Sequence, residues 1–146
     1  MNNLTNTHSG YMTIKEFFKN DIFATEAGVE LLETGNGTAR ARMEILPKHL
    51  NGGGVCQGGA IFTLADLAFA AAVNSHAQLT FSIQSNIQFF KSESSGYLYA
   101  DAKEIFNKGK LASVEVSVTN EAGEMIALFN GMGYHKGTPL PFEPMQ

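Results

Sequence analysis

The sequence predicts an α+β fold in which one long helix is wrapped by an antiparallel sheet. Residues 58–74 form an apolar run that is too long for a strand and suits a buried helix. A single apolar helix followed by enough sheet to cover it favours such a layered architecture. Four later segments alternate apolar and polar residues as strands do: 80–90, 97–106, 111–119 and 124–134.

A shorter helix and a β-hairpin are expected before the long helix. Apolar residues recur at helical spacing over 14–27, with Thr13 as the N-cap and Glu16 placed to complete a capping box. Two strands, 29–33 and 38–46, then flank an Asn-Gly pair of the kind that favours a tight hairpin turn.

The strand over 80–90 is expected to be half-buried. Its alternation predicts that the apolar side chains share one face and the polar side chains the other. The apolar set is Phe81, Ile83, Ile87 and Phe89. The 146 residues fit one domain, 1–146, with loose tails expected at 1–10 and at the proline-rich 137–146.

The composition limits the classes of partner and compartment. The formal net charge is −4 and the basic residues are scattered, so bulk charge does not favour a nucleic-acid partner. Cys56 is the one cysteine, so no intramolecular disulfide can form, which suits the cytoplasm. We expect no signal peptide, and the apolar run over 60–73 is shorter than the roughly 20 residues of a membrane span.

One acid, Asp66, interrupts the apolar helix. Burying a carboxylate without a partner is costly, so its presence needs a reason. The structural interpretation is a bond to a loop or a narrow solvated stripe. The chemical interpretation is that Thr63 and Asp66 form a small polar island on one helix face. Such an island in a water-poor pocket is typical of general-base or nucleophilic chemistry.

Gly58 and Gly59 stand at the expected start of the same helix. A helix N-terminus presents N–H groups without intrahelical acceptors and a partial positive charge. Because glycines have no side chains to block a ligand, a carbonyl oxygen could rest there and be polarised, as in an oxyanion hole. The alternative is that the two glycines only form a tight turn into the helix.

The spacing of these groups predicts a site made by two chains. Gly58 and Asp66 are eight residues apart on one helix, which is about 12 Å at a rise of 1.5 Å per residue. A nucleophile must lie about 3 Å from the carbonyl that the amide polarises. We therefore expect Gly58 of one chain to meet Asp66 of a partner, with two equivalent sites in a homodimer.

The stretch LNGGGVCQGGAIFTLADLAFAAAVNS, residues 50–75, resembles the hotdog-fold acyl-CoA thioesterases of the phenylacetate-degradation (PaaI-like) type. Their pattern is Asn-Gly, then His-Gly-Gly, then a helix reading roughly FsLAD-AfA-A-NS. The likeness extends through IQFFKSESSGYLYADAKEI and ALFNGMGYHKG and covers most of the chain. It implies a hotdog fold, hydrolysis of acyl-CoA or aryl-CoA thioesters with no metal or separate cofactor, and homodimers that often pair into homotetramers.

The resemblance also implies roles for single residues. Asp66 would be the nucleophile or the base for a water, Gly58 the oxyanion donor, and Asn51 a holder of the water or the acid. Gln57 stands where the family has a histidine that helps to position or polarise the carbonyl. Glutamine can donate an N–H but cannot carry a proton at neutral pH, so we expect the hydrogen-bonding role to survive and any acid–base role to be lost.

Further side chains are candidates for contact with the substrate. Gly59, Phe62 and Thr63 are expected to bind the substrate, with Phe62 and Phe69 at its acyl end, and Ser82 would reach the carboxylate from the sheet. Lys91 and Lys108 would bind the phosphates of CoA. Each has a simpler alternative, because phenylalanines are commonly core residues and serines and lysines are commonly solvated.

Cysteine and histidine chemistry is the less favoured alternative. Cys56 could be a reactive thiol near a helix N-terminus, or merely a buried side chain. The four histidines lack metal-ligand spacing, and we expect surface or capping roles for them, although His49 could line the site.

Three functions fit these residues. The first is an acyl-CoA thioesterase that uses Asp66 and Gly58. The second is a hotdog hydratase or dehydratase, which would need a catalytic histidine where the chain has Gln57. The third is a non-catalytic acyl-CoA-binding protein. The sequence does not specify the acyl group.

Overall fold

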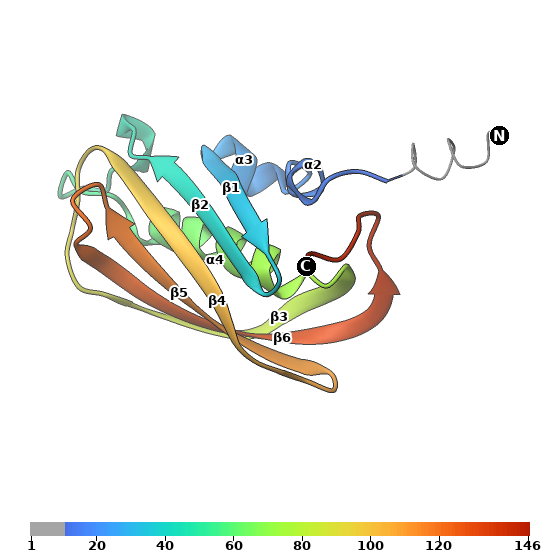
Figure 1. The fold of residues 1–146 in the computed structure, drawn as a ribbon. Coiled ribbons are helices and arrows are strands. Elements are labelled where there is room, and N and C mark those ends of the chain that lie inside the picture. Colours follow the sequence, from blue (N-terminus) through green and yellow to red (C-terminus); the bar gives the residue numbers. More distant parts are fainter. Residues whose placement is uncertain (1–10) are drawn as a thin grey trace.

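The structure is a computed structural model that describes residues 11–146, so the tail expected over 1–10 lies outside the described residues. Six strands form one antiparallel sheet in the order β1-β2-β4-β5-β6-β3. The strands are β1 (Val29–Gly35), β2 (Thr38–Glu44), β3 (Gln78–Phe89), β4 (Tyr97–Lys108), β5 (Leu111–Asn120) and β6 (Met125–Pro139). The sheet curves around one long helix (Figure 1), so the predicted hotdog architecture is confirmed.

The long helix, α4 (Gly58–Val73), lies against the concave face of the sheet, and most of its side chains are buried. Glycines on β6 allow the close approach. A Cβ at Gly131 would lie 2.8 Å from the ring of Phe69, and one at Gly133 would lie 3.0 Å from Val73. None of the described helices is long and apolar enough to cross a membrane.

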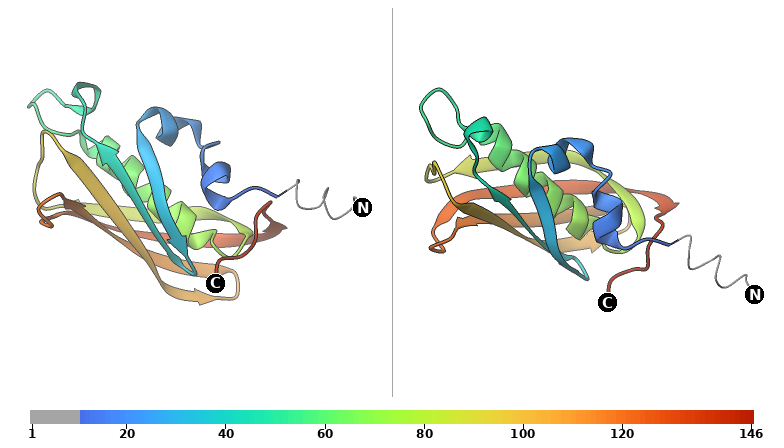
Figure 2. Two further views of the ribbon diagram at one scale, coloured as in Figure 1. Left: turned by 45° about the horizontal axis from the view of Figure 1, so that its top comes forward. Right: turned by 90° about the horizontal axis from the view of Figure 1, so that it is seen from above.

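The helix predicted over 14–27 is two short helices, α2 (Ile14–Phe18) and α3 (Ile22–Glu26), so the prediction of one helix was wrong. The capping box between Thr13 and Glu16 is confirmed. Asp21 causes the break, because its side chain accepts a hydrogen bond from the Ala24 N–H (3.1 Å) and starts a new helix. Both helices lie on the same side of the sheet as α4, beside β1 (Figure 2).

The predicted alternation of β3 is wrong at its first half. A register shift between Ser82 and Gln84 places one extra residue, Ile83, in the strand. Thr80 and Ser82 therefore face α4 on the same side as Ile87, whereas Phe81 faces outward. Relative to the strict alternation predicted from the sequence, the bulge places the side chains of residues 80–82 on the opposite face.

The C-terminal tail, expected to be loose over 137–146, packs against the fold. Phe142 is buried and its ring lies 5.5 Å from that of Phe17 in α2. Backbone bonds join Met145 to Ser75 (2.8 Å) and Leu140 to Ala77 (2.8 Å). The prediction failed because the apolar partners of this segment come from distant parts of the chain.

Candidate active site

The turn into α4 leaves one backbone N–H without an acceptor. Gln57 is the N-cap residue, and its Oε1 accepts from the Gly59 N–H (2.6 Å). Its backbone carbonyl accepts from the N–H groups of Ala60 (2.9 Å) and Ile61 (3.3 Å). Within residues 11–146, the Gly58 N–H has no hydrogen-bond partner. It is therefore the donor that remains for an incoming carbonyl oxygen.

Asp66 is partly buried two turns further along α4. Burial raises the pKa of this carboxyl, and the negative charge of Asp21 raises the pKa further. A carboxylate with a raised pKa is a stronger base, which suits proton abstraction from water. The neighbouring Thr63 hydroxyl donates to the Gly59 carbonyl (2.8 Å), so its proton is used within the helix.

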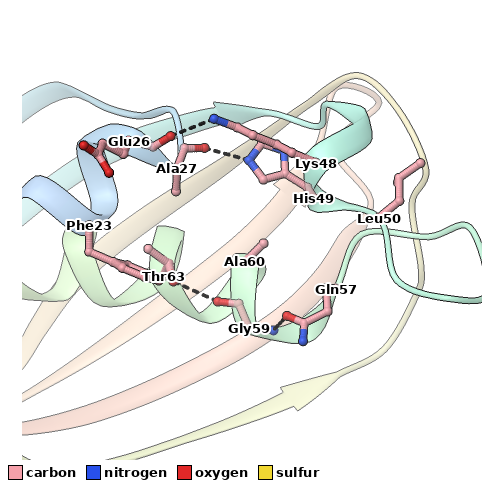
Figure 3. Close-up of a pocket in the computed structure, with 10 residues that line it drawn as sticks. All are labelled: Phe23, Glu26, Ala27, Lys48, His49, Leu50, Gln57, Gly59, Ala60 and Thr63. Carbon is pink, nitrogen blue, oxygen red and sulfur yellow. Dashed lines mark hydrogen bonds between the residues drawn. The ribbon is translucent and has the colours of Figure 1, made fainter.

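A hollow of about 460 Å³ lies beside the turn, and we name it the α3 hollow (Figure 3). Its walls come from α3, from the short 3-10 helix η1 (Pro47–His49) and from the start of α4. Three predicted site residues meet here: Gln57, Gly59 and Thr63. The complete lining is Phe23, Glu26, Ala27, Lys48, His49, Leu50, Gln57, Gly59, Ala60 and Thr63.

A second hollow of about 360 Å³ borders Gly58, and we name it the β3 hollow. It is lined by Cys56, Gly58, Ile61, Phe89, Phe90, Lys91 and Ser92. The adjacent glycines thus border one hollow each. Burial raises the pKa of the Cys56 thiol, which keeps it protonated and favours a packing role over a nucleophilic one.

Asn51 organises the glycine loop. Its Oδ1 accepts from the N–H groups of Gly53 (2.8 Å) and Val55 (3.3 Å). Its side chain is exposed, and the carboxamide NH₂ remains able to donate. The contact with water or acid that the resemblance implies stays a prediction.

Three other predicted residues lie apart from the turn within one chain. Phe62 packs edge-on against Phe129, with 5.2 Å between ring centroids, which gives it a core contact. Ser82 lies on the inner face of β3 and bonds Ser85 (3.0 Å between hydroxyl oxygens). Lys108 lies at the β4–β5 hairpin, toward the C-terminal end of α4 and away from Gly58.

The sequence analysis missed two residues near this site, Phe23 and Asp21, and gave the third, His49, only as the less favoured alternative. Phe23 is 75% exposed and lines the α3 hollow, and Asp21 acts on Asp66. His49, for which a surface or capping role was favoured and lining the site was the alternative, is only 5% exposed and lines the same hollow. The N-cap position of Asp21 was visible in the sequence, whereas the other two depend on how α3 packs.

The described residues contain no cluster of three or more His, Cys, Asp or Glu side chains that could hold a metal ion. What the site offers within one chain is a polarising N–H, a carboxyl with a raised pKa, and two hollows beside the turn. The continuous helix between Gly58 and Asp66 keeps them about 12 Å apart along the axis.

Comparison with known proteins identifies the family. The model of the Thioesterase superfamily matches residues 53–127. A putative esterase of Archaeoglobus fulgidus is 38% identical over 130 residues, which is 88% of this chain and 84% of that protein. The acyl-coenzyme A thioesterase PaaI of Escherichia coli is 27% identical over 138 residues, 94% of this chain and 99% of that protein.

Solved structures agree with these matches. The structure of E. coli PaaI superimposes with a TM-score of 0.82 at 27% identity, covering 86% of this chain and 91% of that one. The Streptococcus mutans protein smu.793, bound to acetyl CoA, gives a TM-score of 0.73 at 25% identity over 77% of this chain and 91% of that one. The chain therefore belongs to the thioesterase superfamily, in its PaaI-like hotdog group, and is a thioester hydrolase.

Proposed function

We propose that the protein hydrolyses acyl-CoA thioesters, with Gly58 as oxyanion donor and Asp66 as nucleophile or general base. The observation that carries this proposal is the unpaired Gly58 N–H at the start of the helix that bears the acid. Two relatives support CoA thioesters as the substrate class. The E. coli relative is named an acyl-coenzyme A thioesterase, and the S. mutans structure is bound to acetyl CoA.

Two chemical routes fit these groups. In the first, Asp66 takes a proton from water, the hydroxide adds to the thioester carbon, and collapse of the intermediate expels the CoA thiolate, which takes up the proton. In the second, Asp66 attacks the carbon, expels the thiolate and forms a mixed anhydride that water then hydrolyses. In both, the oxyanion accepts a hydrogen bond from the Gly58 N–H and is stabilised by the helix dipole.

The proposed site requires a second copy of the chain, because one helix separates its donor and acid by about 12 Å. Strand β3 is an edge of the sheet and offers unpaired backbone groups. Three of its apolar side chains are more than half exposed: Phe81 (55%), Ile83 (56%) and Phe89 (51%). Pairing of β3 with a partner's β3 would cover them. The further pairing of dimers into tetramers stays a prediction.

The remaining residues take supporting roles in this proposal. The Oε1 of Gln57 caps the helix, which leaves its Nε2 to donate toward the thioester carbonyl. Lys91, beside the β3 hollow, is exposed and suits the phosphates of CoA. Ser82 and Lys108 would act in the site of the partner subunit. The same proposal includes a cytoplasmic location. It requires no cofactor beyond the CoA of the substrate.

The hydratase alternative needs a histidine free to exchange protons. His49 lines the α3 hollow, but both of its ring nitrogens already have hydrogen-bond partners. This argues against hydratase chemistry at the site. The non-catalytic binding alternative is distinguished from the proposal by the thiol-release assay described next.

The first experiment measures thiol release from a panel of acyl-CoA and aryl-CoA thioesters. Asp66→Asn is expected to reduce kcat by about 100-fold or more, the size typical of a lost base or nucleophile. Asp101→Asn is the matched control, because Asp101 is an exposed acid on β4. A wild-type protein that binds these thioesters without releasing thiol would establish the binding function instead.

A mixed dimer tests the sharing of the site. Asp66→Asn and Gly58→Pro each remove one half of every site in their own dimers. In a dimer of one chain of each kind, a shared site that combines the intact Gly58 with the intact Asp66 is restored. Random pairing should then recover about one quarter of wild-type activity. If the mixture is no more active than the two variants measured alone, the two-chain site is wrong.

A further inference from the structure

His49 has both ring nitrogens engaged. Nδ1 accepts from the Leu46 N–H (2.9 Å), and Nε2 contacts the Ala27 carbonyl oxygen (2.6 Å). A backbone N–H can only donate and a carbonyl can only accept, so the two partners together fix the ring as neutral with its proton on Nε2. The side chain is buried, and it therefore holds this arrangement away from competing water.

The same residue is also bonded through its backbone. The His49 carbonyl accepts a hydrogen bond from the N–H of Gln57 (2.7 Å). Gln57 is the N-cap residue of α4. A chain of hydrogen bonds therefore runs from α3 through His49 to Gln57 and the turn, and Figure 3 shows its first and last bonds, Ala27–His49 and Gln57–Gly59. Lys48 forms a second, exposed hydrogen bond between η1 and α3, in which its Nζ donates to the Glu26 carbonyl (2.7 Å).

The helix held by His49, α3, is linked to both groups that one chain contributes to the two proposed sites of the dimer. Its C-terminal end, at Ala27, is bonded to the His49 ring, and its N-terminal end begins at Asp21, whose charge acts on Asp66. Between these ends, Phe23 forms a wall of the α3 hollow. A shift of α3 relative to the turn would therefore change the shape of the hollow and the surroundings of the acid together.

We propose that His49 is a positioning residue for thioester hydrolysis, which fixes α3 and the Gly58 turn in their relative places through its ring and its carbonyl. This rests on the proposed function of Gly58 and Asp66. Both ring nitrogens of His49 are bonded to backbone groups, so this proposal gives the ring no contact with the reacting atoms. It acts through Gln57, whose placement sets the direction of the Gly58 N–H. A misplacement of about 1 Å at such a group can cost 100-fold in rate, so a rigid anchor has a kinetic effect.

A second buried histidine provides a matched control. His135 is 5% exposed, as His49 is, and its ring nitrogens bond the Thr80 hydroxyl (2.7 Å) and the Asn107 carboxamide oxygen (2.9 Å). It lies beside the C-terminal end of α4, roughly 22 Å along the helix from Gly58. Loss of either ring should destabilise the fold comparably, but only His49 also bonds the turn, through its backbone carbonyl.

The test compares His49→Ala, His49→Gln and His135→Ala by kcat and KM, well below their melting temperatures. We expect His49→Ala to lower kcat by about 10- to 100-fold with a smaller change in KM. His49→Gln can both accept and donate, so it should recover most of the loss. His135→Ala should melt earlier than wild type yet keep kcat within about threefold. Equal kcat losses in the two alanine variants would overturn the proposal.

Hydrogen exchange of the amides at 57–61 gives a readout that does not depend on turnover. Exchange there should be faster in His49→Ala and unchanged in His135→Ala. If the wild-type protein releases no thiol, the proposed function fails, and the catalytic consequence of His49 fails with it. If wild type is active but His49→Ala keeps both its kcat and its exchange protection, the His49 proposal alone is wrong.

Discussion

Replacing Gly58 with proline would remove the N–H that the proposed mechanism uses while keeping the helix. Gly58 is the first residue of α4, where proline is well tolerated because its missing N–H has no intrahelical acceptor. Gln57 has ψ of 139°, in the extended region that a residue before proline prefers. The substitution therefore changes one donor with little strain in the backbone.

The added side chain needs its own control. A Cβ at position 58 would lie 3.1 Å from Cζ of Phe89, so the ring must move by a few tenths of an ångström. Gly58→Ala carries the same Cβ and retains the N–H. Loss of one oxyanion donor typically lowers kcat by about 100- to 1,000-fold, or about 3–4 kcal/mol of transition-state stabilisation. Gly58→Pro should show this loss relative to Gly58→Ala.

The assay is thiol release at saturating acyl-CoA, with circular dichroism and gel filtration to verify fold and assembly. We expect Gly58→Ala to remain within about tenfold of wild type, because only packing against Phe89 changes. KM should change little in the proline variant, since the lost bond forms chiefly in the transition state. A folded Gly58→Pro protein as active as Gly58→Ala would refute the oxyanion role.

The raised pKa of Asp66 and the position of Lys91 lead to three further predictions. Asp21→Asn keeps an N-cap for α3 but removes the charge that raises the pKa of Asp66, so the acid limb of kcat/KM should move to lower pH; an unmoved limb would contradict this. A carboxyl whose folded pKa is raised destabilises the fold as pH rises through that pKa. Asp66→Asn should therefore melt higher than wild type at pH 8, and this gain should vanish toward pH 4, as thermal unfolding would measure. Lys91→Ala should raise KM for an acyl-CoA but not for the matching pantetheine thioester, which lacks the nucleotide phosphates; equal effects on both would place Lys91 outside the CoA site.

Much of the fold could be predicted from periodicity and local signals. The apolar run gave α4 almost to the residue, because a continuous apolar segment of that length is too long for a strand. The turn at Asn36-Gly37 was equally local, since Gly37 has φ of +74°, which glycine adopts without strain. Asp66 and Gly58 were identified because a lone acid and paired glycines contrast with their apolar surroundings.

The failures share a different cause. The break between α2 and α3 depends on which of two caps, Thr13 or Asp21, governs each turn, and both are compatible with helical spacing. The bulge at Ile83 is set by pairing with β6, so alternation within β3 could not reveal it. The tail packs because Phe142 meets Phe17, which lies far away in the sequence.

The sequence by itself determined the long buried helix, the glycines at its start and the acid within it, because these follow from residues that are neighbours along the chain. The structure showed why Gly58, the donor that the resemblance implies, keeps an unpaired N–H: the Gln57 side chain caps Gly59 instead. Only the tertiary structure decided that His49 lies buried between α3 and the turn. Hydrogen-bond partners are chosen by proximity in space, and a single sequence does not state that proximity.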